Sequence, residues 1–189
     1  MPEPTPPQTV GPFFRPSLLR DDRSAIRGPG SQGGPVALEG RVLDGRGDPI
    51  GDAMVEVWQA NAHGRYRHPL DTRDAPLQEG FLGFGRAATD RSGRFRFETV
   101  RPGPVPWPEG GWQAPHLNLQ VFARGLLDRL STRVYFDGDP ANDDDPVLRG
   151  VPGDRRSTLV ARPTGDDDTP TYRLDIVLQG PDETVFFDV

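Results

Sequence analysis

The sequence predicts an all-β protein: an antiparallel β-sandwich with an extended N-terminal arm and few short helical turns. Apolar residues alternate with polar ones in short runs, which is the pattern of strands with one buried face. Gly and Pro contribute 23 and 22 of the 189 residues and fall largely between these runs, where they mark turns. A chain of this length suits one domain that buries a core without disulfide bonds. We therefore expect the sandwich at residues 35–189, after an arm at residues 1–34.

The arm has many prolines and glycines and no sustained periodicity. Proline removes helical and ladder hydrogen bonds, so residues 1–34 are not expected to form a regular element. The segment still carries apolar residues that an unattached tail would not need, namely Val10, Phe13, Phe14, Leu18 and Leu19. We expect it to pack either on its own domain or on a partner subunit.

Period-two alternation begins at Val36 and recurs to the end of the chain. The predicted strands, in chain order, are residues 36–42, 53–58, 95–97, 117–121, 134–136 and 172–178. The turn at Asp44–Pro49 predicts that the first two strands are neighbours, and the turn at Thr89–Gly93 leads into the third. The only helical candidate is a short turn at 156–161. Six or seven short strands with such connections are typical of a β-sandwich.

Composition excludes several classes of function. A net charge of −6 argues against nucleic acid as a partner. The absence of cysteine excludes disulfides, Cys-ligated zinc and a thiol nucleophile. No apolar run approaches the ~20 residues of a membrane span, and the first residues lack the features of a signal peptide, so we expect a cytoplasmic protein. The acidic runs Asp143–Asp145 and Asp166–Asp168 lack the ligand spacing of a calcium loop and are expected to be solvated loops.

The three histidines do not predict a metal site. His63 and His68 lie in a Gly- and Arg-rich connection and are expected to be exposed. His116 starts a strand, on which residues i and i+2 share a face, so His116 and Asn118 point the same way. An amide is a weak, uncharged ligand for a hard ferric ion, and His116 alone cannot hold a metal.

Seven segments occur together in a specific order: Thr5–Phe13, Val55–Asn61 with Gly64–Tyr66, Phe84–Asp90, Val100–Pro104, Ala114–Asn118, Arg133–Asp137 and Gly180–Asp188. On these segments the chain resembles the intradiol ring-cleavage dioxygenases over nearly its whole length. Within that family, the segments around Ala114 and Gly180 resemble the α-type subunits of the protocatechuate 3,4-dioxygenases.

The resemblance implies an Fe(III) centre held by two tyrosinates and two histidines, all supplied by a β-type subunit. The matching positions of this chain are degenerate: the tyrosines fall on Arg73 and Val105, and the histidines on His116 and Asn118. An arginine of the catalytic subunits falls on Gln113. We therefore expect no metal ligand set and no catalytic residue in this chain, and we expect the isolated chain to be inactive.

The resemblance also implies that an α-type subunit lines the active site of its β-type partner. The matching positions for substrate binding are Arg124 and, on the arm, Thr9, Gly11, Pro12 and Phe13. The expected function is O2-dependent cleavage of protocatechuate to 3-carboxy-cis,cis-muconate by a higher hetero-oligomer that contains both subunit types. A guanidinium at Arg124 would favour the anionic substrate; the alternative is a structural arginine at a strand end.

Two other functions stay open on the sequence. One is a self-sufficient intradiol dioxygenase for another catechol, which would need its iron ligands from the three tyrosines together with His116, His63 or His68. The other is a non-enzymatic β-sandwich binding module that needs no partner subunit.

Overall fold

The computed structural model describes residues 6–21, 23–165 and 169–188. Strands dominate this part of the chain, so the all-β class is confirmed. The strands are β1 (Pro35–Leu43), β2 (Met54–Trp58), β3 (Phe84–Ala88), β4 (Arg94–Val100), β5 (Val105–Pro106), β6 (Trp112–Gln113), β7 (His116–Phe122), β8 (Leu130–Phe136), β9 (Val160–Pro163), β10 (Thr171–Arg173) and β11 (Ile176–Val177). The helical segments are α1 (Phe14–Leu18), η1 (Pro140–Asp143), α2 (Pro146–Gly150) and η2 (Arg156–Leu159).

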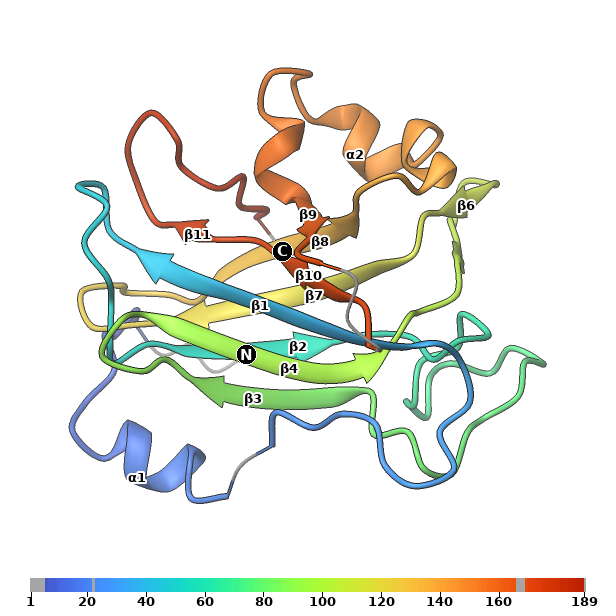
Figure 1. Cartoon of the computed structure of the whole chain (residues 1–189), viewed down its shortest axis with the longest axis horizontal. Helices are drawn as coiled ribbons and strands as arrows, with labels where there is room; N and C mark the ends of the chain where they lie inside the picture. The colour runs from blue at the N-terminus through green and yellow to red at the C-terminus, as the bar shows by residue number, and fades with distance from the viewer. Residues whose placement is uncertain (1–5, 22, 166–168, 189) are drawn as a thin grey trace.

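Nine of the described strands form one sheet, which runs β11-β1-β10-β9-β8-β7-β2-β3, with β4 paired to β1. In Figure 1, β1 and β4 cross in front of β2 and β7, while α1 and α2 lie at opposite ends of the view. The ladders β1–β10, β1–β11 and β8–β9 are parallel. The prediction of a purely antiparallel sheet is therefore wrong, since period-two alternation does not report strand direction.

The hydrophobic core lies between the two halves of this sheet. Alternate residues of β1 and β4, such as Leu38 and Phe97, point to the same cluster as Val57 of β2 and Leu119 of β7, and all four are buried. Burial of apolar surface contributes about 25 cal/mol per Å², so this shared cluster is the main force that holds the halves together. The outward faces of the same strands are left free for function.

The first two predicted strands are present but are not neighbours, which corrects the prediction. The chain does turn after β1, where Asp48 and Asp44 are hydrogen-bonded through their backbones at 2.9 Å. Yet β1 pairs with β4, β10 and β11, whereas β2 pairs with β3 and β7. The connection carries the chain from one half of the sheet to the other. Alternation is the same in a hairpin and in such a crossing, so the sequence pattern did not separate them.

The last predicted strand, residues 172–178, is divided into β10 and β11 around Leu174 and Asp175. The carbonyl of Leu174 approaches β1 so closely that a Cβ at Gly40 would lie 1.9 Å from its oxygen. Only glycine permits this contact. Asp175 then accepts from the backbone N–H and the guanidinium of Arg41 at 3.0 and 2.7 Å, which fixes the break on β1.

The short helical turn predicted at 156–161 is present over Arg156–Leu159 as η2, but residues 160 and 161 belong to β9, and the sequence analysis missed α1, η1 and α2. Both η1 and α2 begin with an Asp N-cap followed by Pro, at Asp139-Pro140 and Asp145-Pro146. This pair is a recognised helix-start signal that could have been used. The acidic runs have different outcomes: Asp143 and Asp144 are exposed, Asp145 is fully buried, contrary to prediction, and 166–168 lie outside the described residues.

The buried Asp145 carboxylate joins three elements. Its Oδ1 accepts from the N–H groups of Val147 and Leu148 at 3.0 and 2.7 Å and from the hydroxyl of Tyr135 at 2.9 Å. Its Oδ2 accepts from the N–H of Ala114 at 2.8 Å. A buried carboxylate is tolerated only when its acceptor sites are filled in this way. Asp145 therefore caps α2 and fastens it to β8 and to the entry of β7.

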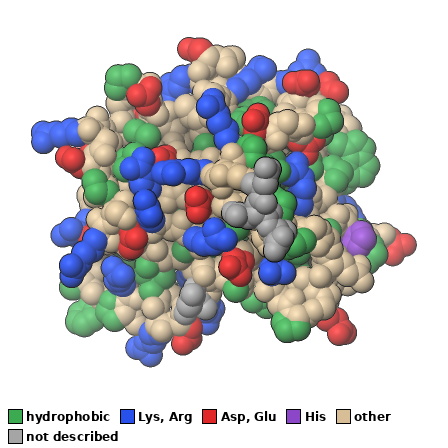
Figure 2. All heavy atoms as spheres, in the orientation of Figure 1, with side chains coloured by type: hydrophobic (Ala, Val, Ile, Leu, Met, Phe, Trp, Pro, Cys, Tyr) green, Lys and Arg blue, Asp and Glu red, His purple; other side chains and the backbone are tan. Residues whose placement is uncertain are grey.

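The segment before β1 is partly incorporated into the fold. Ile26 is fully buried in the main core, and the residues around it bridge to β3 and β4. On the opposite, solvent-facing side of β1 and β4, Figure 2 shows arginines interleaved with acidic side chains. Arg41–Asp175 and Arg96–Glu39 are two of these ion pairs. None of the described helices is both long enough and apolar enough to cross a lipid bilayer.

We predict that Asp145→Asn lowers the free energy of unfolding by about 2–4 kcal/mol, because an amide turns one acceptor oxygen into a donor opposite N–H groups. Urea unfolding of the purified chain, followed by tryptophan fluorescence, measures this. Asp144→Asn removes the same charge one residue earlier, where the side chain is exposed, and should change stability by less than about 0.5 kcal/mol. Equal effects of the two substitutions would contradict the role of the network.

Candidate functional site

The outer face of β2, β7 and β8 carries the candidate site. Antiparallel ladders align Trp58 with Asn118 and, on the other side of β7, Asn118 with Arg133. A groove of about 640 Å³ runs over this face and is lined by these residues together with Gln120. The positions of this chain that match functional residues of the family lie at the two ends of β7, near His116 and beyond Phe122. Six strand steps of ~3.3 Å separate these ends by about 20 Å.

At the first end, His116 is buried and held in one tautomer. Its Nδ1 lies 2.7 Å from the carbonyl of Ala114 and must donate to it, which leaves a lone pair on Nε2. Burial, and next the charge of Arg133, lower the pKa of His116 to about 4. The imidazole is therefore neutral near pH 7. His63 and His68 are both exposed, as predicted.

The Tyr66 hydroxyl lies beside this histidine, a contact that the sequence analysis missed. The hydroxyl is 3.5 Å from His116 Nε2 and accepts from Asn118 Nδ2 at 3.2 Å. The ring stacks on Trp58 with centroids 5.9 Å apart. Burial raises the pKa of Tyr66, so it remains a neutral phenol. A neutral phenol between an imidazole and an amide completes a local hydrogen-bonded cluster.

The remaining ligand positions border a hollow of about 620 Å³ next to Tyr66. Arg73 donates through Nε and Nη2 to the Asp71 carboxylate at 2.8 and 2.5 Å, and through Nη2 to the carbonyl of Gly64 at 2.8 Å. These bonds lower the pKa of Asp71 to about 2 and raise that of Arg73. Val105 lies on the far side of the hollow and has no donor atom on its side chain.

Arg133 is a second cation at this end that was not predicted as a site residue. Its Nη1 donates to Oε1 of Gln113 at 2.8 Å and lies 3.5 Å from the Tyr135 hydroxyl. The β7–β8 register places Arg133 opposite Asn118 and Tyr135 opposite His116. Cross-strand pairing of the two predicted strands could have found it, since directly opposite residues have Cβ atoms about 5 Å apart.

These donors do not fit a ferric ion. Fe³⁺ needs anionic, hard ligands to balance its charge, whereas this end offers one neutral imidazole, one neutral phenol and one amide. Arg73 and Arg133 add positive charge, which opposes a trivalent cation. Within the described ranges, no three His, Asp or Glu side chains gather as a possible metal site. The arrangement can donate and accept hydrogen bonds, but it lacks what metal activation of a catechol requires.

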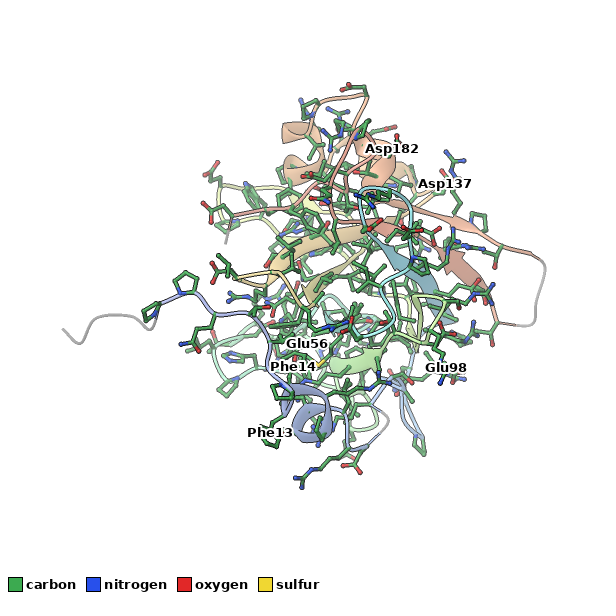
Figure 3. The ribbon with its side chains drawn as sticks, turned by 90° about the vertical axis from the view of Figure 1, so that its left-hand side faces the viewer. Phe13, Phe14, Glu56, Glu98, Asp137 and Asp182 are labelled. Atoms are coloured by element: carbon green, nitrogen blue, oxygen red, sulfur yellow. The ribbon has the colours of Figure 1, made fainter. Side chains whose placement is uncertain are left out.

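At the second end, the arm covers the same sheet face. Phe14 packs on Phe122 of β7 with ring centroids 5.7 Å apart, and Thr9 Oγ1 accepts from the N–H of Gly125 at 2.9 Å. A groove of about 550 Å³ between the arm and the end of β7 is lined by all four predicted arm residues, Thr9, Gly11, Pro12 and Phe13. Phe14 faces the sheet, whereas Phe13 points away from the body (Figure 3) and is 79% exposed.

Arg124 follows β7 directly and adjoins this groove, because its neighbour Gly125 is bonded to Thr9. Its guanidinium Nε forms an ion pair with a carboxylate oxygen of Asp52, which precedes β2. The Arg124 side chain is 78% exposed. The structure therefore brings the five predicted substrate-binding residues together, at the opposite end of β7 from the predicted ligand positions.

Comparison with known proteins identifies the family. A family model described as dioxygenase matches residues 10–180. The chain is 44% identical to the protocatechuate 3,4-dioxygenase alpha chain of Burkholderia cepacia, across 98% of this chain and 97% of that one. The chain belongs to the intradiol dioxygenase family. This confirms the resemblance seen in the sequence, and the family is one of iron-dependent oxidoreductases.

The intradiol dioxygenase fold is also seen in a solved relative. The dioxygenase domain of a carbohydrate-binding fusion protein from Streptomyces sp. SirexAA-E is 26% identical, with a TM-score of 0.63 over 94% of this chain and 99% of that one. The protocatechuate 3,4-dioxygenase beta chain of Burkholderia cepacia is 41% identical across 86% of this chain and 72% of that one. Identity alone thus separates the alpha and beta types poorly, and the site residues must do so.

The ligands that a self-sufficient intradiol enzyme would need are scattered. Tyr66 and His116 are together, and His68 lines the hollow beside Tyr66, but Tyr135 is bonded to the buried Asp145. The Tyr172 ring packs edge-on against Phe136, with centroids 4.9 Å apart, in the main core. His63 lies 3.4 Å from Gln32 at an exposed position. The described geometry does not favour this alternative.

We predict an acid-sensitive contribution of His116 to stability. Its folded pKa of about 4 lies below the unfolded value of about 6.5, so the unfolded chain binds the proton more readily. The free energy of unfolding should therefore fall as the pH drops from about 6.5 to about 4, by up to about 3 kcal/mol. In His116→Asn, whose amide can still donate to Ala114, urea unfolding as a function of pH should show a shallower slope.

The control for this measurement is His63→Asn, at an exposed position. It should keep the pH dependence of the parent chain. A parent-like slope in His116→Asn would show that other groups cause the acid sensitivity.

Proposed function

We propose that this chain is the non-catalytic α-type subunit of a protocatechuate 3,4-dioxygenase. It would complete the active site of a β-type partner for O2-dependent intradiol cleavage of protocatechuate to 3-carboxy-cis,cis-muconate. Both oxygen atoms of O2 enter the product, and the bond that breaks joins the two hydroxyl-bearing carbons. The chemistry that activates the catechol belongs to the ferric ion, which we assign to the β-type subunit.

The donor set supports the α type over the β type. The alpha and beta relatives are 44% and 41% identical to this chain, a difference too small to decide. The positions for two anionic tyrosinate ligands hold Arg73 and Val105, one a cation and the other without a ligand atom. A chain with these residues is suited to support a metal site elsewhere, and a β-type partner can supply one.

The observation that carries the proposal is the separation of the two ends of β7. The arm end of β7 lies about 20 Å from His116 and about 13 Å from Asn118, which is too far for a single catechol to touch both sets. Residues that bind substrate at the arm end must therefore act on a site that another chain provides. The exposure of Phe13 and Arg124 is consistent with a partner surface at that end.

Arg124 is the residue of this chain that we expect to touch the substrate. Protocatechuate bound as a catecholate carries at least two negative charges, and a guanidinium offers five donors in a planar fork. The Nε donor faces Asp52, and the remaining donors point from a highly exposed side chain. Thr9, Gly11, Pro12 and Phe13 would form an adjoining wall, with Phe13 as its apolar part.

The same proposal covers the architecture and assembly. The two halves of the sheet act as the layers of a β-sandwich at residues 35–189, and residues 1–34 form the arm that packs on the partner subunit. Ile26 and the Thr9–Gly125 hydrogen bond fasten the arm to its own domain, and the exposed ring of Phe13 is left to contact the partner. Subunit pairs would then assemble into a larger symmetric hetero-oligomer, in the cytoplasm.

We predict that iron and activity appear only in the complex. The chain should be expressed alone and with a β-type partner, and each preparation assayed for iron and for protocatechuate-dependent O2 uptake. The lone chain should be colourless and inactive, because its donor set does not balance Fe³⁺. Iron and O2 uptake in the lone chain would overturn the proposal. If a stable complex forms but is no more active than the β-type partner alone, this chain is a binding module and does not complete the active site.

In the active complex, we predict that Arg124→Ala raises KM for protocatechuate about ten-fold or more, since a charge-assisted contact contributes about 1.5–3 kcal/mol. Arg124→Lys keeps the charge but loses the planar fork, so its rise should be smaller. Arg149→Ala removes an equal charge from an exposed position on α2, which lies at the opposite end of the view in Figure 1 from α1 of the arm, and is the matched control. Steady-state O2 uptake measures all three, and an unchanged KM for Arg124→Ala would remove Arg124 from the site.

A further inference from the structure

Asp52 is the side chain that meets Arg124, and nothing in the family resemblance pointed to it. It lies two residues before the start of β2, and its carboxylate is in contact with the guanidinium Nε of Arg124. The two residues are 72 positions apart in the chain. Their meeting therefore needs an explanation from the fold.

The explanation is the register of the β2–β7 ladder. Met54 pairs with Phe122, and Glu56 pairs with Gln120. Continuing this antiparallel register two residues outward places Asp52 opposite Arg124, on the same face as these pairs. Directly opposite side chains on one face are neighbours, and opposite charges there attract. The ion pair is thus a continuation of the sheet beyond its last hydrogen bond.

The Arg124–Gly125 segment is also held from a second direction. The Thr9 hydroxyl accepts the N–H of Gly125 at 2.9 Å, which ties the arm to the same loop. Gly125 has a φ of +89°, a left-handed conformation that suits glycine and turns the chain sharply after Arg124. The backbone of Arg124 is therefore fixed by the arm, while its side chain is fixed by Asp52.

We infer that Asp52 is a positioning residue that orients Arg124 toward the substrate of the partner's active site. This inference rests on the proposed function of the chain. An arginine with 78% of its side chain exposed samples many rotamers in solution and would lose that freedom on binding a ligand. Asp52 holds the Nε group of Arg124 before the substrate binds. This reduces the conformational entropy that the Arg124 side chain loses on binding, and it leaves the terminal nitrogens free for the anionic substrate.

The charge of Asp52 acts in the opposite direction, because a carboxylate near the site repels an anionic substrate. That repulsion passes through exposed, salt-containing solvent and is screened over about 8 Å at physiological ionic strength. The two effects predict opposite changes in KM, so substitution can separate them. Asp52→Asn keeps an oxygen that can accept from Nε but removes the charge, whereas Asp52→Ala removes both.

The experiment uses the active complex with a β-type partner and measures kcat and KM for protocatechuate by O2 uptake. If Asp52 positions Arg124, Asp52→Ala should raise KM about three- to ten-fold, with kcat changed less than about two-fold. Asp52→Asn should raise KM less. In an Arg124→Ala background, Asp52→Ala should add no further change, because coupled residues are not additive.

Glu39→Gln is the matched control, since it removes an equally exposed carboxylate from an ion pair with Arg96 on the other half of the sheet. It should leave both constants unchanged. Thermal unfolding of the complexes should show Asp52→Ala within about 2 °C of the parent, which separates positioning from loss of structure.

The outcomes that overturn the inference are distinct. If Arg124→Ala raises KM but Asp52→Ala leaves it at the parent value, Asp52 does not position Arg124, although the proposed function stands. If both Asp52 variants lower KM equally, Asp52 acts only through its charge. If Arg124→Ala itself has the parent KM, the proposed role of Arg124 fails, and the inference fails with it.

Discussion

The hydrogen-bonded register of β7 is the constraint on which the rest of the structure depends. It sets Asn118 against Trp58 on one side and against Arg133 on the other. It also decides that the arm and His116 lie on one face of β7, about 20 Å apart. A shift of one residue would turn the polar face of β7 inward and the buried residues outward. The core residue Leu119 prevents this, because it fills the space between the halves of the sheet.

The end of β7 near His116 is held together by protein groups alone. The backbone carbonyl of Ala114 fixes the imidazole tautomer, and Asp145 fixes the N–H of Ala114. The local cations Arg73 and Arg133 would oppose a ferric ion, which needs anions around it. The Asp71 carboxylate is already engaged by Arg73. The buried hydrogen-bonding groups and the local charges are therefore balanced by other protein groups, without a metal.

Much of this arrangement was accessible from the sequence, and the remainder has physical reasons for being missed. Alternation located β1, β2, β4, β7 and part of β8, and the shared face of His116 and Asn118, but it missed β3 and β9. It could not give strand order, so β1 and β2 were wrongly paired. The acidic run Asp143–Asp145 was predicted to be a solvated loop because of its charge. Three backbone N–H groups and a hydroxyl nevertheless make burial of the Asp145 carboxylate favourable. Contacts such as Tyr66 with His116 join segments whose approach depends on the whole fold.

The exposed ring of Phe13 has a consequence for how such a chain exists in a cell. The Phe13 side chain is 79% exposed on a proline-rich arm, and it can associate with other apolar surfaces until one of them covers it. In the assembly that we propose, molecules made in excess of the partner would keep this ring in solvent and would meet chaperones, proteases or one another. Balanced synthesis of the two chains would then be favoured by the chemistry of one side chain, without any dedicated regulator.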